Sequence, residues 1–121
     1  MGRLNNSVAI VTGAAQGIGA AYAKAMAAEG ASVVVADRDD GQKVVEEIIA
    51  AGGTALNVVT DVSDETSCAA MATQTIDAFG RIDILVNNAA IFGHLDAKPF
   101  EEISVDEWDT LMAVNVRGVF V

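Results

Sequence analysis

The stretch Thr12-Gly13-Ala14-Ala15-Gln16-Gly17-Ile18-Gly19 places three glycines between a short apolar run and an alanine-rich segment. The first glycine permits a tight turn, the second lets the backbone approach a ligand, and the third lets a helix pack closely. The free N–H groups and the dipole of the following helix favour an anion such as a pyrophosphate. We therefore predict a phosphate-binding turn made by Gly13, Gln16, Gly17, Ile18 and Gly19.

Glycines alone also fit an ordinary strand-to-helix turn, so their surroundings matter. The stretch is not a Walker A loop, because no Gly-Lys-Ser/Thr follows it. Asp37 ends the next apolar run, 18 residues after Gly19, where a carboxylate can accept hydrogen bonds from a ribose hydroxyl pair. Its charge would repel a 2′-phosphate, so NAD is favoured as cofactor. Arg38 could pair with such a phosphate, which leaves NADP as the less favoured alternative.

Outward from this turn, strand-like and helix-like segments alternate along the chain. The strands are predicted at residues 7–12, 32–36, 54–59 and 82–87, and the helices at residues 20–29, 39–51, 64–79 and from 104 onward. Helices between successive strands force parallel pairing through right-handed crossovers. The strands are apolar without alternation, as expected when helices cover both faces of a sheet. The sequence predicts an α/β fold with a parallel sheet. Because the glycine turn is typical of dinucleotide-binding folds, a Rossmann-like, doubly wound sheet in strand order 3-2-1-4 is expected.

The composition excludes several classes of protein. The 121 residues fit one domain, and a formal charge of −10 argues against binding to nucleic acid or anionic lipid through bulk electrostatics. One cysteine, Cys68, and one histidine, His94, argue against a disulfide framework and a multi-cysteine zinc site, so no metal site is predicted. No apolar run approaches the roughly 20 residues of a membrane span, and no signal peptide is recognised. A cytoplasmic location is therefore expected.

Asn115 is an unusual residue in the last predicted helix. It falls in an apolar stripe with Trp108, Leu111, Met112 and Val119, which recur at helical spacing. A buried amide needs hydrogen-bond partners, and a polar residue in an apolar stripe often marks function. The stripe predicts a buried, functional Asn115, with a purely structural asparagine as the alternative.

Together these residues resemble the short-chain dehydrogenase/reductase family. The glycine stretch matches its Thr-Gly-x-x-x-Gly-x-Gly pattern, and Asp61-Val62 matches its acidic–hydrophobic pair after the third strand. Asn87-Asn88-Ala89-Ala90 resembles its Asn-Asn-Ala-Gly motif, with Ala90 in place of the glycine. Asn115 matches the asparagine of its fourth helix. Four motifs in the right order, spread over nearly the whole chain, make the resemblance specific.

The resemblance implies a role for each matching residue in the cofactor site. The glycine turn would border the pyrophosphate and the nearby ribose. Asp61 would contact the adenine amino group through its carboxylate, and Val62 would contact the ring through its backbone. Asn88 and Ala89 would line the adenosine ribose, while Asn87 would tie neighbouring strands together.

The resemblance also implies a reaction, a substrate class and an assembly. Asn115 would belong to a catalytic tetrad, where it holds a water in a proton relay. The complete protein would transfer a hydride between a nicotinamide cofactor and a small-molecule secondary alcohol or ketone. Relatives pair through their fourth and fifth helices, so a homo-oligomer is expected for the complete protein.

The sequence lacks the family's Tyr-x-x-x-Lys, which supplies the acid/base group. Tyr22 is the only tyrosine, and Met26 occupies the position four residues later. We therefore expect residues 1–121 to be an NAD(P)-binding half-domain that is incomplete at its C-terminus and inactive alone. A non-catalytic dinucleotide-binding module and a truncated product without independent activity are the alternatives. His94 is expected in a surface loop, with substrate contact as the alternative.

Overall fold

The computed structural model describes residues 2–91 and 97–121 of the chain. Its four parallel strands are β1 (Val8–Thr12), β2 (Ser32–Asp37), β3 (Thr54–Val59) and β4 (Ile84–Val86). They lie in the order β3-β2-β1-β4. The connecting helices are α1 (Gly17–Ala28), α2 (Gln42–Ala50) and α3 (Glu65–Phe79). The predicted fold class, parallel pairing and strand order are confirmed.

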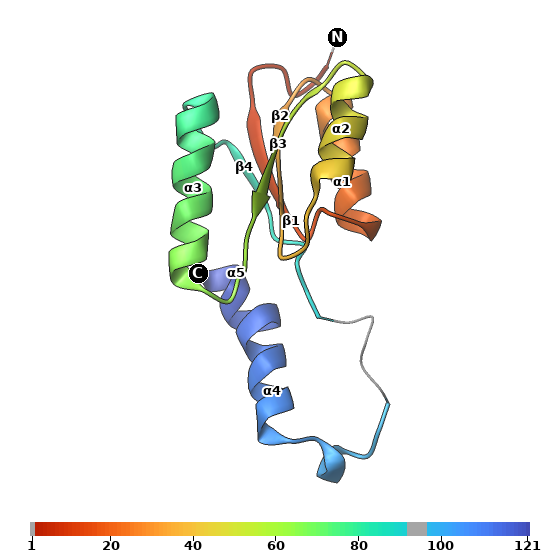
Figure 1. Cartoon of the computed structure of the whole chain (residues 1–121), viewed down its shortest axis with the longest axis vertical. Helices are drawn as coiled ribbons and strands as arrows, with labels where there is room; N and C mark the ends of the chain where they lie inside the picture. Colours follow the sequence, from red (N-terminus) through yellow and green to blue (C-terminus); the bar gives the residue numbers. More distant parts are fainter. Residues whose placement is uncertain (1, 92–96) are drawn as a thin grey trace.

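Helices cover both faces of the sheet, which explains why its strands are apolar throughout. In Figure 1, α1 and α2 lie on one face and α3 lies on the other. Val33 and Val35 of β2 pack in the cluster on the α1 and α2 face, whereas Val34 and Ala36 pack in the cluster that includes Met71 of α3. Successive side chains of a strand point to opposite faces, so β2 contributes apolar side chains to two layers of core.

Local capping sets the ends of the helices. The Asp64 side chain accepts a hydrogen bond from the Thr66 amide at the start of α3, and Gly80, with φ of 82°, ends it. Ser104 caps α4 (Val105–Met112) by accepting from the Glu107 amide. The first helix begins at Gly17 rather than at residue 20, because the last residues of the glycine stretch already have helical hydrogen bonding.

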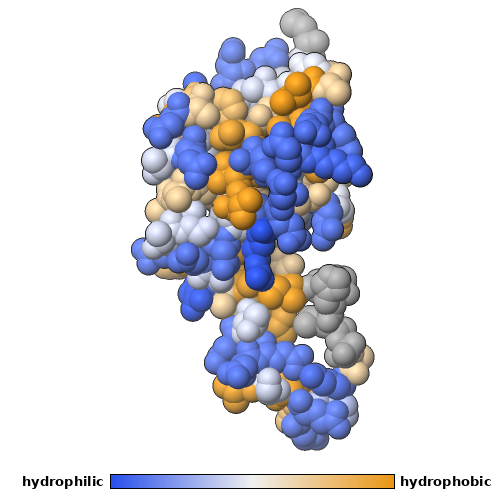
Figure 2. All heavy atoms as spheres, viewed as in Figure 1, coloured by the Kyte–Doolittle hydropathy of each residue, from blue (hydrophilic) through white to orange (hydrophobic). Residues whose placement is uncertain are grey.

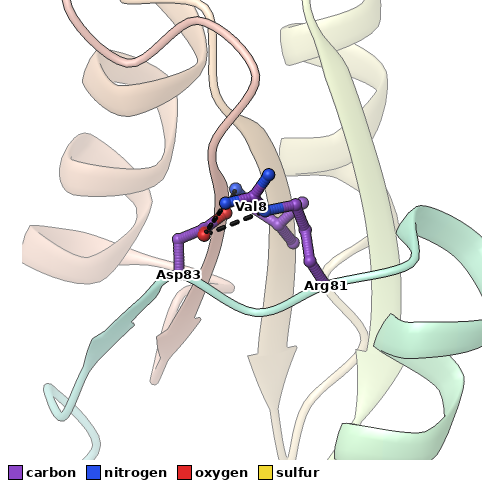
Figure 3. A network of polar contacts seen from close by, with 3 residues as sticks. All are labelled: Val8, Arg81 and Asp83. Atoms are coloured by element: carbon purple, nitrogen blue, oxygen red, sulfur yellow. Dashed lines mark hydrogen bonds and ion pairs between the residues drawn. The ribbon is translucent and has the colours of Figure 1, made fainter.

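The observed β4 is shorter than predicted, and the side chain of Asp83 binds β1 just ahead of it. The structure has β4 over three residues, whereas residues 82–87 were predicted. Ahead of it, Asp83 accepts a hydrogen bond from the Val8 amide at 2.8 Å, and the Arg81 guanidinium binds the same carboxylate at 2.6 Å (Figure 3). At this end of the β1–β4 pair, the Val8 amide therefore donates to a side-chain carboxylate and not to a backbone carbonyl.

The last helical region extends away from the sheet. It consists of α4, the π-helical turn η2 (Ala113–Arg117) and α5 (Gly118–Phe120), and a short 3-10 turn, η1 (Phe100–Glu102), precedes it (Figure 1). The apolar stripe predicted to be buried is exposed, with 59% of Trp108 accessible. Val114 and Gly118 are the buried positions instead. Trp108 and Met112 lie on α4, ahead of the π-helical turn, and α4 extends away from the sheet, so this face of the helix does not pack against the sheet.

Apolar side chains remain at the surface of this region. Figure 2 shows orange apolar surface on the lower part of the molecule, where Figure 1 has α4. Phe120 is 80% exposed, and Phe100, Val105 and Met112 are exposed as well. Within residues 2–91 and 97–121, no helix has the length and apolar content that crossing a membrane requires.

Candidate functional site

A cleft of about 530 Å³ lies at the carboxyl ends of the parallel strands. In open α/β sheets this edge binds ligands, at the point where successive connections run to opposite sides, as they do here at β1. Most of the residues predicted to bind a cofactor line it. These are Gly13, Gln16, Gly17, Ile18, Asp37, Arg38, Val62, Asn88 and Ala89.

The three glycines of the turn have different surroundings. Gly13 and Gly17 have φ values of +66° and +60°, which lie in the left-handed region that favours glycine. A Cβ on Gly13 would lie 2.9 Å from the Cα of Ala89, whereas one on Gly17 would meet no described atom within 4 Å. A Cβ on Gly19 would collide with the Gly13 carbonyl oxygen. Gly17 therefore faces open space, while Gly13 and Gly19 allow the turn to pack.

The amino end of α1 has no anionic partner within the described chain. Gln16 is its N-cap residue but makes no side-chain capping bond, and the first turn holds no acidic residue. By contrast, Asp40 accepts from the Gln42 amide at the start of α2, and Asp64 and Ser104 cap the later helices. The amides of the first turn of α1 have no partners within their own helix. They fit an anion supplied by a ligand in the cleft.

Thr12 and Asn88 hold the turn after β4 against the glycine turn. The Thr12 hydroxyl donates to the Val86 carbonyl and accepts from the Asn88 and Ala89 amides, both at 3.0 Å. The Asn88 side-chain amide donates to the Gly13 carbonyl at 3.2 Å. The resemblance assigned this tie between strands to Asn87, whereas the structure makes it with Thr12 and Asn88.

Asp37 closes the glycine turn onto the end of β2. Its Oδ2 accepts from the Ala15 amide at 2.9 Å, and its Oδ1 accepts from the Asp39 amide at 3.0 Å. A carboxylate has about four acceptor positions, so two backbone bonds leave room for ligand hydroxyls. Asp37 therefore fits a ribose, as the sequence predicted, and it also organises the turn.

Asp61 lies beside the cleft, in the loop between β3 and α3. Its Oδ1 accepts hydrogen bonds from the Ser63 amide at 2.9 Å and from the Ser63 hydroxyl at 2.6 Å. These bonds, with smaller contributions from Arg38 and Arg117, lower the pKa of the Asp61 carboxyl. Gly19 and Asp61 are the two predicted cofactor residues that adjoin the cleft rather than line it.

Asn115 is exposed in η2, which corrects the prediction that it is buried. Its amide is satisfied by backbone instead of core side chains, because its Oδ1 accepts from the Ile91 amide at 2.8 Å and its Nδ2 donates to the Ile91 carbonyl at 3.2 Å. Ile91 lines the cleft, so Asn115 fixes part of the cleft wall. π-helical turns often occur at functional sites.

Other cleft residues were not singled out as cofactor-binding from the sequence. They are Asp39, Thr60, Ala90, Ile91 and Val114. Thr60 directly follows β3 and Asp39 lies two residues after the end of β2, and these positions near strand ends are the signal that could have identified them. Ile91 and Val114 carry no polar signal, since only the fold brings them to the cleft. His94 lies outside the described residues, and among those described no three His, Cys, Asp or Glu side chains gather as a metal site requires.

Comparison with known proteins identifies close similarities over almost the whole chain. The family model of the short chain dehydrogenases matches residues 7–121. An uncharacterized oxidoreductase of Mycobacterium tuberculosis is 53% identical over 119 residues, which are 97% of this chain and 48% of that protein.

Two solved structures with nicotinamide cofactors are similar in sequence and fold. A metagenomic short-chain oxidoreductase in complex with NADP is 42% identical, with a TM-score of 0.88 over 97% of this chain and 53% of that one. The 3-ketoacyl-(acyl-carrier-protein) reductase of Brucella melitensis, complexed with NADH, is 41% identical, with a TM-score of 0.84 over 97% of this chain and 47% of that one. The chain spans about half the length of these proteins.

Proposed function

This chain belongs to the short-chain dehydrogenase family, and from that premise we propose that it forms the cofactor-binding half of an oxidoreductase. The complete enzyme would transfer a hydride between a nicotinamide cofactor and a small-molecule secondary alcohol or ketone. One observation carries the proposal: the glycine turn, the uncapped amino end of α1 and the Asp37 carboxylate all border a single cleft. A dinucleotide needs this combination, with a diphosphate at the turn and a ribose at the acid.

NAD is the cofactor that we propose, because of the charge at the end of β2. Asp37 and Asp39 both line the cleft there, against one cation, Arg38. A 2′-phosphate would lie close to the Asp37 carboxylate, and two like charges about 4 Å apart repel by about 1–4 kcal/mol at the edge of a protein. The similar proteins include one complex with NADP and one with NADH, so they do not distinguish the two cofactors. The proposed preference for NAD therefore rests on the side chains at the end of β2.

The residues of the chain would bind and orient the cofactor, which itself supplies the hydride chemistry when bound. The α1 amides and Gly17 would hold the diphosphate, and Asp37 would accept hydrogen bonds from the ribose. We propose that Val62 lies against the adenine. Asp61, whose Oδ1 accepts both hydrogen bonds from Ser63, would accept from the adenine amino group through its Oδ2.

We propose that Asn115 contributes to catalysis by shaping the site. Its two bonds to Ile91 fix the segment that leaves β4, at the side of the cleft opposite Asp37. In the complete protein Asn115 would hold a water in a proton relay, as the family resemblance implies. An amide does not titrate at neutral pH, so Asn115 alone cannot supply the proton. We therefore expect no dehydrogenase turnover from residues 1–121 alone, whatever ketone is offered with NADH.

Calorimetric titration of the chain with NAD and with NADP tests the proposal. We expect saturable NAD binding and binding of NADP that is weaker by about tenfold or more. Asp37→Asn keeps the shape of the side chain and one acceptor oxygen but removes the negative charge. It should therefore strengthen NADP binding and reduce the preference for NAD over NADP. Asp77→Asn, on α3, is the matched control and should leave the preference unchanged. A folded chain that gives no heat with either dinucleotide would contradict the proposal.

A further inference from the structure

The loop between β3 and α3 forms the cleft wall beside the ends of β2 and β3. Thr60 and Val62 line the cleft from this loop, and the Thr60 amide donates to the Asp37 carbonyl at 2.7 Å. Behind the wall the loop is folded on itself, because Ser63 binds the Asp61 carboxylate and the Asp64 amide donates to the Asp61 carbonyl at 3.1 Å. The position of Val62 therefore depends on how this loop is held.

Arg117 reaches the loop from the other end of the sequence. Its Nη2 donates to the Ser63 carbonyl oxygen at 3.2 Å, across 54 residues. The next residue, Gly118, lies against the wall itself, since a Cβ there would come within 2.8 Å of Val62 Cγ2. Figure 1 shows α5 beside the start of α3, consistent with both contacts. The helical region thus supports the loop at Ser63 and at Val62.

Arg117 supports the loop from outside the cleft. It lines a separate hollow on the helical region, together with Asp109, Met112 and Phe120. Its positive charge also favours the ionised Asp61 carboxylate within the same loop. Arg117 does not line the cleft, so its contact with the cleft wall is made through the loop.

We propose that Arg117 is a positioning residue for the adenosine end of the dinucleotide. By holding the Ser63 carbonyl it keeps Val62 at a fixed distance from the glycine turn across the cleft. The inference rests on the proposed function, because it assigns the adenosine moiety to this wall. If Arg117 has this role, binding of the adenosine end of the cofactor depends on Arg117, whereas binding of the diphosphate does not.

Binding of AMP, NAD and inorganic pyrophosphate to the full chain and its variants tests the proposal. Arg117→Gln loses a hydrogen bond from a charged donor, so AMP and NAD should bind about three- to tenfold more weakly. Pyrophosphate, which needs only the glycine turn, should bind with unchanged affinity. Arg117→Lys keeps a charged donor and should restore AMP affinity to within about twofold. Arg81→Gln removes the same charge at the opposite end of the sheet and should change none of these affinities.

Hydrogen exchange gives a second measurement that needs no ligand. The Asp64 amide should exchange faster in Arg117→Gln than in the wild type, with no such change in Arg81→Gln. Unchanged exchange, or an equal loss of AMP and pyrophosphate affinity, would overturn the proposal. So would unchanged AMP affinity in Arg117→Gln while the wild type binds NAD. A wild type that binds neither AMP nor NAD would instead overturn the proposed function, together with the inference that rests on it.

Discussion

The strands β2 and β4 lie in one sheet and both contribute apolar side chains, yet they differ in how fully these side chains are covered. Val33, Val34 and Val35 of β2 are completely buried between two layers of helix, whereas Leu85 of β4 is 51% exposed. Ile84 and Val86 pack against the α1 and α2 cluster, so Leu85, between them, points to the face that carries α3. The core formed by β1, β2 and their helices is complete, while β4 and the helical region after it leave apolar surface uncovered.

The contrast indicates how the stability of the molecule is distributed. Burial of a Val side chain contributes about 1.5–3 kcal/mol, and β1 and β2 together bury most of theirs. The helical region buries Val114 and Gly118 and leaves Trp108 and Phe120 at the surface. Regions with few buried apolar contacts open at lower free energy than the core does. The cleft spans both regions, since Gly13 comes from one and Ile91 and Val114 come from the other.

The largest expected effect comes from placing the same charge in each strand. Val34→Asp should lower the free energy of unfolding by about 3–5 kcal/mol, because a buried carboxylate there would have no partner. Leu85→Asp, at a half-exposed position, should cost about 1 kcal/mol or less. Urea unfolding followed by circular dichroism measures both. An equal loss of unfolding free energy in the two variants would contradict the prediction, because it would show that Leu85 is as fully buried as Val34.

A methyl group at the junction of the two regions should have the next largest effect. Gly13→Ala forces a left-handed backbone on alanine, which costs about 1–2 kcal/mol, and it also presses on the backbone of Ala89. That overpacking adds about 1–3 kcal/mol. Gly17→Ala carries the same backbone cost without a collision, so it is the matched control. If the two variants have the same unfolding midpoint in urea, the Gly13–Ala89 contact is not tight.

The uncovered apolar surface predicts that the chain associates with itself. An edge strand with an exposed leucine can pair with another chain, and a lysine on such an edge opposes pairing. Leu85→Lys should therefore raise the concentration at which the chain associates, by about tenfold if pairing is worth about 1.4 kcal/mol. Ile49→Lys, which changes a similarly exposed residue on α2, should leave association unchanged. Sedimentation velocity over a range of concentrations distinguishes the two variants, and a monomeric wild type would contradict the prediction.

The smallest expected effect concerns the carboxylate that joins β1 to β4. Hydrogen bonds from Arg81 and from the Val8 amide lower the pKa of Asp83 (Figure 3). A carboxyl with a lowered pKa in the folded state stabilises the fold above its unfolded pKa of about 3.9, and the contribution is lost as the pH falls through the folded value. Asp83→Asn should lower the urea concentration at the unfolding midpoint at neutral pH. In acid, the midpoints of the variant and the wild type should converge. A difference between them that is the same at every pH would contradict this prediction.

Several elements of the fold and the site were predictable from local sequence. The glycine turn and Asp37 follow from spacing, parallel pairing follows from the helices between successive strands, and the strand order follows from the fold that the glycine turn indicates. The burial of Asn115 was predicted wrongly because helical spacing predicts which residues share a face, but not whether that face packs against the sheet. The length of β4 was overestimated at both ends, and at its start the Val8 amide donates to the Asp83 side chain, while the Asp83 amide still donates to the Val8 carbonyl.

The sequence by itself determined which segments contain the strands, where the phosphate-binding turn lies and which carboxylate stands at the end of the second strand. These features depend on composition and spacing over a few residues, so they can be inferred without coordinates. Only the tertiary structure decided that Thr12 and Asn88 join two turns, that Ile91 and Val114 line the cleft, and that Arg117 holds the Ser63 carbonyl. Those contacts join residues far apart in the chain, and their partners are largely backbone atoms, which every residue carries and no sequence pattern distinguishes.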